Sequence, residues 1–381
     1  MNQFEDGIFQ VLNELKNERM KCGGKVYNFS VGTPDFKPSE SIVRAVVEAA
    51  GIPENYKYAL SELPELIEAV KERFQARYQV ELEADEITSV YGSQEGIAHI
   101  GLTLCDPGDV VLVPNPGYPI FEIGPALAGA EIVSYDLKEE NGYLPDLSFI
   151  DAEILERTKF IVVSYPLNPV CKTAPDSFYE ELIAWAKKNE IWVIHDNAYS
   201  DIVYDQKKGK SFLSFEGAKE VGVEFYSLSK SFNYTGARVG FLVGNRYVVE
   251  QLKQLRSQID YGTFLPVQYG AIAALKEPET FILKQCEEYE KRRNALCDGL
   301  TAIGWTMERS EGTMFAWGKI PSGFSDDKEF VKILLEKTGV LCTPGSSFGT
   351  LGKNHVRFAL VLPVETITDA IRMIQKSEIL G

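Results

Sequence analysis

The stretch SLSKSFNYTGARVGF, residues 227–241, combines side chains that could bind and react with a small molecule. Lys230 follows the apolar run VGVEFYS, which is typical of a buried strand, and Arg238 comes eight residues later. An ammonium group is seldom fully buried without a partner, so a lysine at this place has two interpretations. Either its stem lies on the protein and its charge reaches solvent, or it is a reactive amine beside an anion that Ser227 and Arg238 bind.

Further polar side chains follow two other apolar runs. KFIVVSYP leads to Asn168, and IWVIHD ends at Asp196, with Tyr199 three residues later. In open α/β sheets, ligands bind where the strands end and the loops begin. Each residue also has a purely structural explanation, because Asn-Pro is a common turn and Asp is a common helix cap. Together with Lys230, they predict an amide, a carboxylate, a phenol and an amine at one edge of a sheet.

A phosphate site is indicated by VYGSQEG, residues 90–96. The pattern predicts a strand end, a glycine turn and a helix that begins near Ser93 and Gln94. Free N–H groups at a helix N-terminus suit a phosphate, although serine there is more often a simple cap. Tyr118 in NPGYPIF could add an aromatic ring to the site, or it could be a buried aromatic of the core. Arg357 in HVRFAL could add a cation, or it could pair with a surface carboxylate. As a set, these groups match pyridoxal phosphate.

The elements that must position these residues are predicted between residues 85 and 245. Short apolar runs, most of them without alternation, are separated there by helical stretches such as PDSFYEELIAWAKKNE. Such runs are expected of strands that are covered on both faces. Their alternation with helices predicts a three-layer, mainly parallel α/β sheet. The runs are DVVLVP, EIVSYD, KFIVVSYP, IWVIHD, VEFYSLS and VGFLVG.

After residue 265 the pattern changes and predicts a smaller α+β domain. A long helix follows Pro278, and TMERSEGTMFAWGKI is typical of a hairpin with Gly312 near its turn. We therefore divide the chain into residues 1–45, which join the small domain, a large cofactor-binding domain over 46–277, and the small domain over 278–381. Helical spacing near the N-terminus predicts an amphipathic helix that covers the chain's own core or a neighbouring subunit. Its apolar residues are Phe4, Ile8, Val11, Leu12 and Leu15.

Composition sets outer limits on function. The 381 residues are 45% apolar and 25% charged, enough for two packed domains. Nucleic acid and membrane surfaces are not expected partners, because the net charge is −16 and such binders carry a basic face. No run approaches the roughly 20 apolar residues of a membrane helix, and charges interrupt any signal peptide. Six cysteines without C-x-x-C spacing predict a cytoplasmic protein, and three scattered histidines make a metal site unexpected.

The ordered set of motifs resembles the class I/II aminotransferases of the aspartate aminotransferase superfamily, which have fold type I of the pyridoxal-phosphate enzymes. The resemblance covers nearly the whole chain and is highly specific for the superfamily, but weakly specific for the substrate. It implies transfer of an amino group between an amino acid and a 2-oxo acid. The motifs are VGTPDF at 31–36, YGSQEG, CDPGDVVLVPNPGYP, YPLNP, HDNAYSDIVYD, SLSKSFNYTGARVGF, PGSSFG and HVRFAL.

The resemblance also implies a role for each candidate residue. Lys230 matches the lysine that holds the cofactor as a Schiff base and acts as the base at Cα, and Asp196 matches the acid that keeps the pyridine nitrogen protonated. The remaining matches are Tyr199 and Asn168 at the phenolic oxygen, Tyr118 on the ring face, Ser93, Gln94, Ser227 and Arg238 at the phosphate, Arg357, Asn168 and Gly32 at the substrate, and Tyr58 at the phosphate of the partner subunit's site. Tyr58 thereby implies a homodimer with shared active sites.

Some departures and alternatives stay open. The usual N-P-T-G is NPVC, with Val170 and Cys171, an aromatic is replaced by Ala237, and the glycine before LPEL is missing. These changes affect loop shape and pocket size rather than the implied chemistry. A β-eliminating C–S lyase of the same fold would share the arginine and the lysine. A non-catalytic regulatory module that binds the cofactor is less favoured, because such proteins usually carry a DNA-binding segment before VGTPDF, and no helix-turn-helix fits here.

Overall fold

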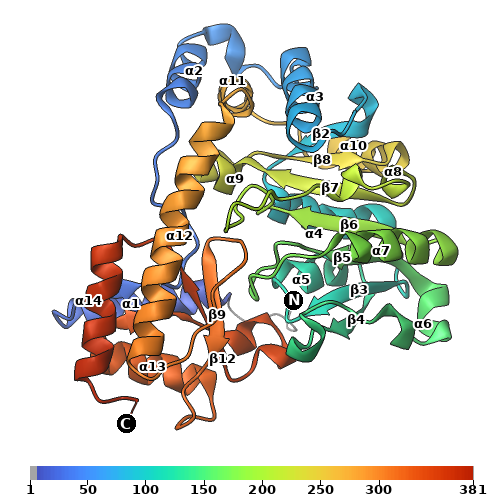
Figure 1. Ribbon diagram of the computed structural model, residues 1–381. Coiled ribbons are helices and arrows are strands. Elements are labelled where there is room, and N and C mark those ends of the chain that lie inside the picture. Colours follow the sequence, from blue (N-terminus) through green and yellow to red (C-terminus); the bar gives the residue numbers. More distant parts are fainter. Residues whose placement is uncertain (1–6, 381) are drawn as a thin grey trace.

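The computed structural model describes residues 7–380, and a seven-stranded sheet runs through its larger part (Figure 1). β8 is antiparallel to both of its neighbours, and every other pair of neighbours is parallel. All six predicted runs form strands, so the prediction of a mainly parallel sheet is confirmed. In spatial order the strands are β2 (Ile87–Val90), β8 (Gly240–Gly244), β7 (Gly222–Ser227), β6 (Trp192–Asn197), β5 (Thr158–Val163), β3 (Val110–Asn115) and β4 (Glu131–Asp136).

Helices cover both faces of this sheet. Successive side chains of a strand point to opposite faces, and on β3 Val110 joins one buried apolar cluster while Val111 joins the other. The two clusters lie between the sheet and its two helical layers, which confirms the three-layer prediction. One cluster includes side chains of α3 (Pro64–Tyr78) and α7 (Asp176–Asn189), and the other those of α4 (Ser93–Leu104), α5 (Ile120–Leu127) and α10 (Arg246–Ile259).

A smaller part of the molecule joins the two ends of the chain (Figure 1). Its three-stranded antiparallel sheet has the order β11-β12-β9, and β1 pairs in parallel with β10, which places Tyr27 opposite Val340. The strands are β1 (Tyr27–Asn28), β9 (Phe315–Lys319), β10 (Val340–Leu341), β11 (Thr343–Pro344) and β12 (His355–Ala359). The remaining helices of the chain are α1 (Ile8–Lys21), α2 (Glu40–Ala50), α6 (Ala152–Arg157), α8 (Ala218–Val221), α9 (Leu228–Ser231), α11 (Leu265–Leu275), α12 (Glu279–Ala302), α13 (Asp327–Thr338) and α14 (Val364–Lys376).

The hairpin predicted for TMERSEGTMFAWGKI is wrong. Only β9 forms there, and it pairs with β12 instead of with the residues before it. The reason is that the preceding loop bonds to the larger part of the molecule. The backbone N–H groups of Glu311 and Gly312 donate to the carbonyl of Cys171, and that of Thr313 donates to the carbonyl of Ile202. The N–H and C=O groups that a hairpin would need are therefore engaged elsewhere.

The amphipathic helix predicted near the N-terminus is present as α1, which contains Ile8, Val11, Leu12 and Leu15. Leu12 is buried, whereas Phe4 lies outside the described residues. No helix formed within residues 7–380 combines the length and the apolar character that crossing a membrane requires.

Candidate active site

A cavity of about 300 Å³ lies where β5, β6 and β7 end, and it gathers the predicted site residues with one exception. Parallel strands end at the same edge of a sheet, so the polar residues that follow them converge. Tyr58 does not line this cavity. The predicted residues that do are Gly32, Ser93, Gln94, Tyr118, Asn168, Asp196, Tyr199, Ser227, Lys230, Arg238 and Arg357.

Lys230 is placed by the single turn of α9, directly after β7. Its Nζ donates a hydrogen bond to the carbonyl of Gly32 at 2.7 Å. Burial lowers the pKa of Lys230 to about 8, and the positive charges of Arg357 and Arg238 act in the same direction. A larger fraction of this amine is therefore neutral near pH 7 than in a free lysine, as a nucleophile or a general base requires.

Gly32 brings the backbone of the N-terminal segment close to this amine. A Cβ at Gly32 would lie 2.5 Å from Cζ of Phe315, a distance that atoms do not tolerate. The glycine therefore lets the ring of Phe315 pack directly against the backbone, while the carbonyl remains free to accept from Lys230.

Asp196 lies near the end of β6 and is 8% exposed. Its Oδ1 atom is buried and has no hydrogen-bond partner in the described part of the chain. Burial raises the pKa of Asp196 to about 7, and the charge of Glu224 adds to this shift, although a backbone hydrogen bond from Ala198 opposes it. A cationic donor brought next to this carboxyl would satisfy Oδ1 and restore the charged form.

An anion-binding cradle surrounds the start of α4. Ser93 is the first residue of the helix, and its Oγ is buried without a partner among residues 7–380. Gly92 has φ +85°, and a Cβ there would lie 2.6 Å from Nη2 of Arg238. The glycine thus allows the guanidinium of Arg238 to lie against the backbone at the helix start. Ser227 adds a second hydroxyl, which accepts from the N–H of Ser229. This arrangement suits a phosphate.

Arg357 is buried on β12, at 1% exposure. Its Nη1 donates to Oδ1 of Asn168 at 2.7 Å and its Nη2 to the carbonyl of Ser30 at 3.3 Å, whereas Nε has no partner in the described part of the chain. Burial lowers the pKa of Arg357 to about 10, and no carboxylate of residues 7–380 pairs with it. Because an unpaired buried charge is costly, this guanidinium is suited to accept a carboxylate ligand.

Two phenols complete the polar lining. Burial raises the pKa of Tyr199, so its hydroxyl keeps its proton and can donate. Tyr118 donates to Oε1 of Gln94 at 3.2 Å, and its ring packs edge-on against Phe121. Burial also raises the pKa of Tyr118. Both groups are therefore neutral donors near pH 7.

Tyr58 lies elsewhere, in the loop before α3. It is 75% exposed, and its ring lies 4.9 Å from that of Tyr261, measured between ring centroids. A single chain does not bring Tyr58 to the cavity. The contact predicted for it involves a second subunit, and it stays a prediction.

Two aromatic residues that contact Arg357 in this cavity were not predicted from the sequence. Phe315 and Phe9 line the cavity, and their ring centroids lie 4.0 Å and 5.6 Å from the guanidinium carbon of Arg357. Phe315 lies on β9, which pairs with the strand of Arg357. The hairpin predicted for TMERSEGTMFAWGKI was wrong, so the pairing of β9 with the strand of Arg357 was not expected. Phe9 lies on α1 outside the apolar stripe that the helical spacing picked out, so no signal in the sequence marked it.

Comparison with known proteins identifies the protein family of this chain. Residues 24–374 match the family described as aminotransferase class I and II. The chain belongs to this family. Class I and II aminotransferases depend on pyridoxal phosphate and move an amino group between an amino acid and a 2-oxo acid, and this chain is therefore an aminotransferase with the type I fold.

Relatives within the aminotransferases have more than one substrate name. The chain is 41% identical to the LL-diaminopimelate aminotransferase of Halothermothrix orenii, covering 98% of this chain and 96% of the relative. It is 39% identical to the glutamate-pyruvate aminotransferase AlaC of Escherichia coli, covering 97% and 90%. Among solved structures, substrate-bound BacF of Bacillus subtilis has a TM-score of 0.93 at 35% identity, covering 97% and 94%. The curated relatives named here give no support to the lyase or to the regulatory module.

Proposed function

We propose that this aminotransferase binds pyridoxal phosphate in the cavity at the ends of β5, β6 and β7. Three buried polar atoms without partners in residues 7–380 support this fit: Ser93 Oγ, Asp196 Oδ1 and Arg357 Nε. A phosphate, a protonated ring nitrogen and a substrate carboxylate would satisfy these three atoms in turn. The buried guanidinium of Arg357 is the strongest support for a ligand in this cavity, because no carboxylate of residues 7–380 pairs with it.

The cofactor, when bound, supplies an electron sink for negative charge at the substrate Cα. Lys230 would hold it covalently through its amine, and Asp196 would keep its ring nitrogen protonated. Asn168 and Tyr199 would bond the phenolic oxygen, and Tyr118 would lie on the ring face. The phosphate would be held by Ser93, Gln94, Ser227 and Arg238.

The chain's own residues orient the substrate and move its proton. The planar fork of Arg357 takes the α-carboxylate in two hydrogen bonds, and Asn168 fixes the orientation of that fork. The amine of Lys230 would take the proton from Cα, because its lowered pKa leaves a larger fraction of it neutral and able to accept a proton. Phe315 covers the guanidinium and keeps water away from it.

The proposed amino donor is LL-diaminopimelate, after the 41% identical relative. One observation favours a second candidate, the glutamate and pyruvate pair named for the Escherichia coli relative, because pyruvate carries no distal charge. The charged residues that line the cavity are Asp196, Lys230, Arg238 and Arg357, and each already has a role. Residues 7–380 of one chain therefore offer no further charged group to the distal ammonium and carboxylate of diaminopimelate, nor to the distal carboxylate of glutamate, and we propose that a partner subunit supplies it.

Two measurements test this proposal. The first compares kcat/KM of the holoenzyme for LL-diaminopimelate with 2-oxoglutarate and for glutamate with pyruvate, and the larger value identifies the donor. The second reduces the holoenzyme with borohydride and maps the labelled peptide. We expect the label on Lys230 and none in Lys230→Ala, whereas the exposed control Lys207→Ala keeps it. Label on another lysine would refute the site.

We also propose that the enzyme works in the cytoplasm as a homodimer, with amino acids and 2-oxo acids as its partners. The division into a cofactor-binding domain over 46–277 and a small domain over 278–381, joined by residues 1–45, is part of this proposal. α2 spans Glu40–Ala50, so we propose a first boundary a few residues earlier, which would keep that helix within one domain. The pairing of β1 with β10 supports the assignment of the N-terminal segment to the small domain.

A further inference from the structure

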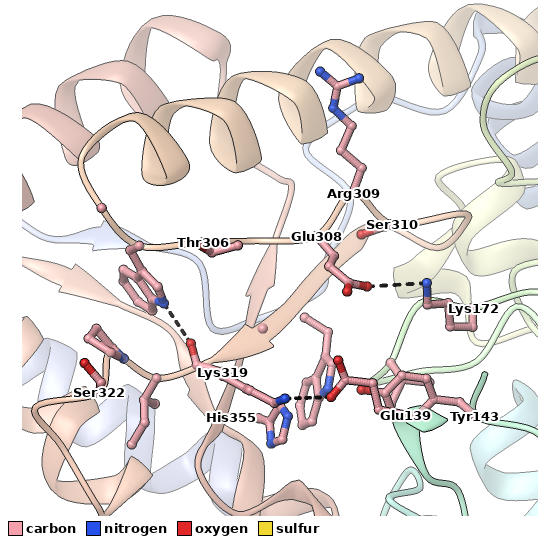
Figure 2. Close-up of a pocket in the computed structure, with 17 residues that line it drawn as sticks. Glu139, Tyr143, Lys172, Thr306, Glu308, Arg309, Ser310, Lys319, Ser322 and His355 are labelled. Carbon is pink, nitrogen blue, oxygen red and sulfur yellow. Dashed lines mark hydrogen bonds and ion pairs between the residues drawn. The ribbon is translucent and has the colours of Figure 1, made fainter. Parts of the chain in front are cut away.

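A second cavity, of about 350 Å³, lies between the larger and the smaller part of the molecule and shares no lining residue with the candidate active site (Figure 2). Glu139, Tyr143 and Lys172 face it from loops of the larger part. The other wall comes from residues 304–306, 308–310, 317–322 and 355 of the smaller part. Any molecule bound here contacts both parts at once.

Two ion pairs cross the boundary at this cavity, as Figure 2 shows. Nζ of Lys319 lies 2.7 Å from Oε2 of Glu139, and Nζ of Lys172 lies 3.5 Å from Oε2 of Glu308. The side chains of Lys319 and Glu139 are about half exposed or more, so their pair is screened by water and contributes little to stability. A charged ligand can therefore open it at small cost.

Aromatic side chains form part of the remaining lining. The ring of His355 stacks on the indole of Trp317, with ring centroids 5.0 Å apart and an angle of 5° between the planes. Trp317 is buried, and its Nε1 has no hydrogen-bond partner in the described residues. Trp305 and Tyr143 add further aromatic surface. An apolar group of a ligand would be covered by these rings.

We propose that this cavity binds a zwitterionic α-amino acid with an apolar side chain. A ligand with only a carboxylate would make a charged contact with Lys319 alone, and a ligand with only an amine would make one with Glu139 alone. A zwitterion can insert between the two groups and satisfy both charges, while its side chain packs against Trp317 and Tyr143.

The cavity is close in sequence and in strand register to the residues proposed to hold the substrate. Val170, which lines it, is two residues from Asn168, and Trp317 is the register partner of Arg357 on the neighbouring strand. An amino acid bound here would touch the segments that carry Asn168 and Arg357 without touching the reacting atoms. The site is thus distinct from the one at which the transferred amino group is exchanged.

Calorimetric titration of the holoenzyme with L-leucine tests this site. In the Arg357→Ala holoenzyme, which lacks the carboxylate acceptor of the active-site cavity, we expect one leucine bound per chain. In the Arg357→Ala background, Lys319→Glu should weaken binding at least tenfold. Arg372→Glu makes the same charge change on an exposed residue of α14, outside the cavity, and should leave binding unchanged.

Two analogues test the requirement for both charges. 4-Methylpentanoate and 3-methylbutylamine, each with one charge of leucine, should bind the Arg357→Ala holoenzyme at least tenfold more weakly. The proposal is overturned if the Arg357→Ala holoenzyme binds no leucine, if Lys319→Glu and Arg372→Glu weaken binding equally, or if either analogue binds as well as leucine. Where Arg357→Ala does not fold, Lys319→Glu and Arg372→Glu are compared in the wild-type background, and Lys319→Glu alone should lose one leucine site per chain.

Discussion

Arg357 has an amide, a carbonyl and the rings of Phe315 and Phe348 around it, but no carboxylate from residues 7–380. Asp196 is its counterpart, a buried carboxyl with one oxygen unpartnered in the same part of the chain. Opposite charges in a protein interior normally pair, yet these two groups bond elsewhere or not at all. At the scale of single residues, the site therefore keeps charges available for a ligand that carries their complements.

Replacement of Arg357 by lysine should separate recognition of the carboxylate from recognition of the rest of the substrate. Lysine keeps the charge but loses the planar fork, so transition-state binding of amino acids should weaken by about 2–5 kcal/mol. Decarboxylated amines of the same shape should lose little. The measurement is kcat/KM for each pair of substrates. Arg372→Lys on the surface is the control, and equal losses for acids and amines in Arg357→Lys would contradict the assignment.

Asp196 should make the stability of the cofactor-free protein depend on pH. Its pKa is about 7 in the folded protein and near 3.8 in the unfolded chain, so the unfolded state releases the proton first. The free energy of unfolding therefore decreases as pH rises from about 4 to 7, by up to about 1.4 kcal/mol per pH unit. Asp196→Asn does not titrate and should lack this loss. Denaturant unfolding of both proteins across this pH range measures the free energy of unfolding. If that free energy changes with pH in the same way in both proteins, the pKa of Asp196 is not raised in the folded protein.

The sequence located these residues to different extents. Asn168, Asp196 and Lys230 follow apolar strands, so their convergence followed from the rule that ligands bind at strand ends. Arg357 was assigned only by resemblance, because nothing within HVRFAL distinguishes a buried substrate arginine from a surface one. Phe9 was not predicted, since a phenylalanine on a helix has the same local pattern whether it faces a core or a cavity.

At the scale of elements, the start of α4 depends on one glycine. Gly92 combines φ +85° with ψ 156°, a conformation that other residues adopt only with strain, and it leaves room for the guanidinium of Arg238. Arg238 is held there by hydrogen bonds to the carbonyls of Tyr91 and Thr235. The cation, the helix start and the serine hydroxyls are thereby kept on one side of the cavity.

Gly92→Ala should damage the cradle beyond its effect on stability. We expect a loss of about 1–3 kcal/mol in the free energy of unfolding from backbone strain, together with weaker binding of pyridoxal phosphate. Gly108→Ala is a matched control, because Gly108 also has a positive φ, of 98°, but a Cβ there meets no atom within 4 Å. Cofactor affinity and unfolding should both be measured. Equal affinity in the two variants would show that the contact with Arg238 does not matter.

The elements themselves followed from the sequence wherever apolar periodicity decided them. The strands of the large sheet and the helices α7, α12 and α13 lie where the patterns predicted them. The loop before β9 did not, because Glu311, Gly312 and Thr313 bond to residues more than a hundred positions away. Periodicity reports local preference, and it contains no information about which distant carbonyl will accept a backbone hydrogen bond.

At the scale of the whole molecule, an exposed group of apolar residues surrounds Tyr58. Tyr56, Leu60, Tyr261 and Phe264 are exposed there, and Tyr56 packs edge-on against Phe264. Large apolar side chains gathered on a surface are typical of a protein interface. This supports the proposed homodimer, in which Tyr58 reaches the phosphate of the neighbouring site.

Mixed dimers test this arrangement. Tyr58→Arg should crowd the neighbour's phosphate site, and Lys230→Ala should remove the amine from its own site, so each homodimer has two damaged sites. In a mixed dimer one site carries both changes and the other carries neither. Refolding the two inactive variants together should therefore restore activity in proportion to the mixed dimer formed. Folded mixed dimers without activity would place both residues in the same chain's site.

The pairing of β1 with β10 joins residues more than three hundred positions apart, since Tyr27 lies opposite Val340. During synthesis, β6 with Asp196 and α9 with Lys230 leave the ribosome well before Val340 and Arg357 do. The phosphate cradle and the amine can thus assemble while the chain is still being made, whereas the carboxylate acceptor cannot. Its completion requires the two ends to meet, a closure whose entropic cost grows with the length of the loop. During synthesis, cofactor capture therefore becomes available before substrate recognition does.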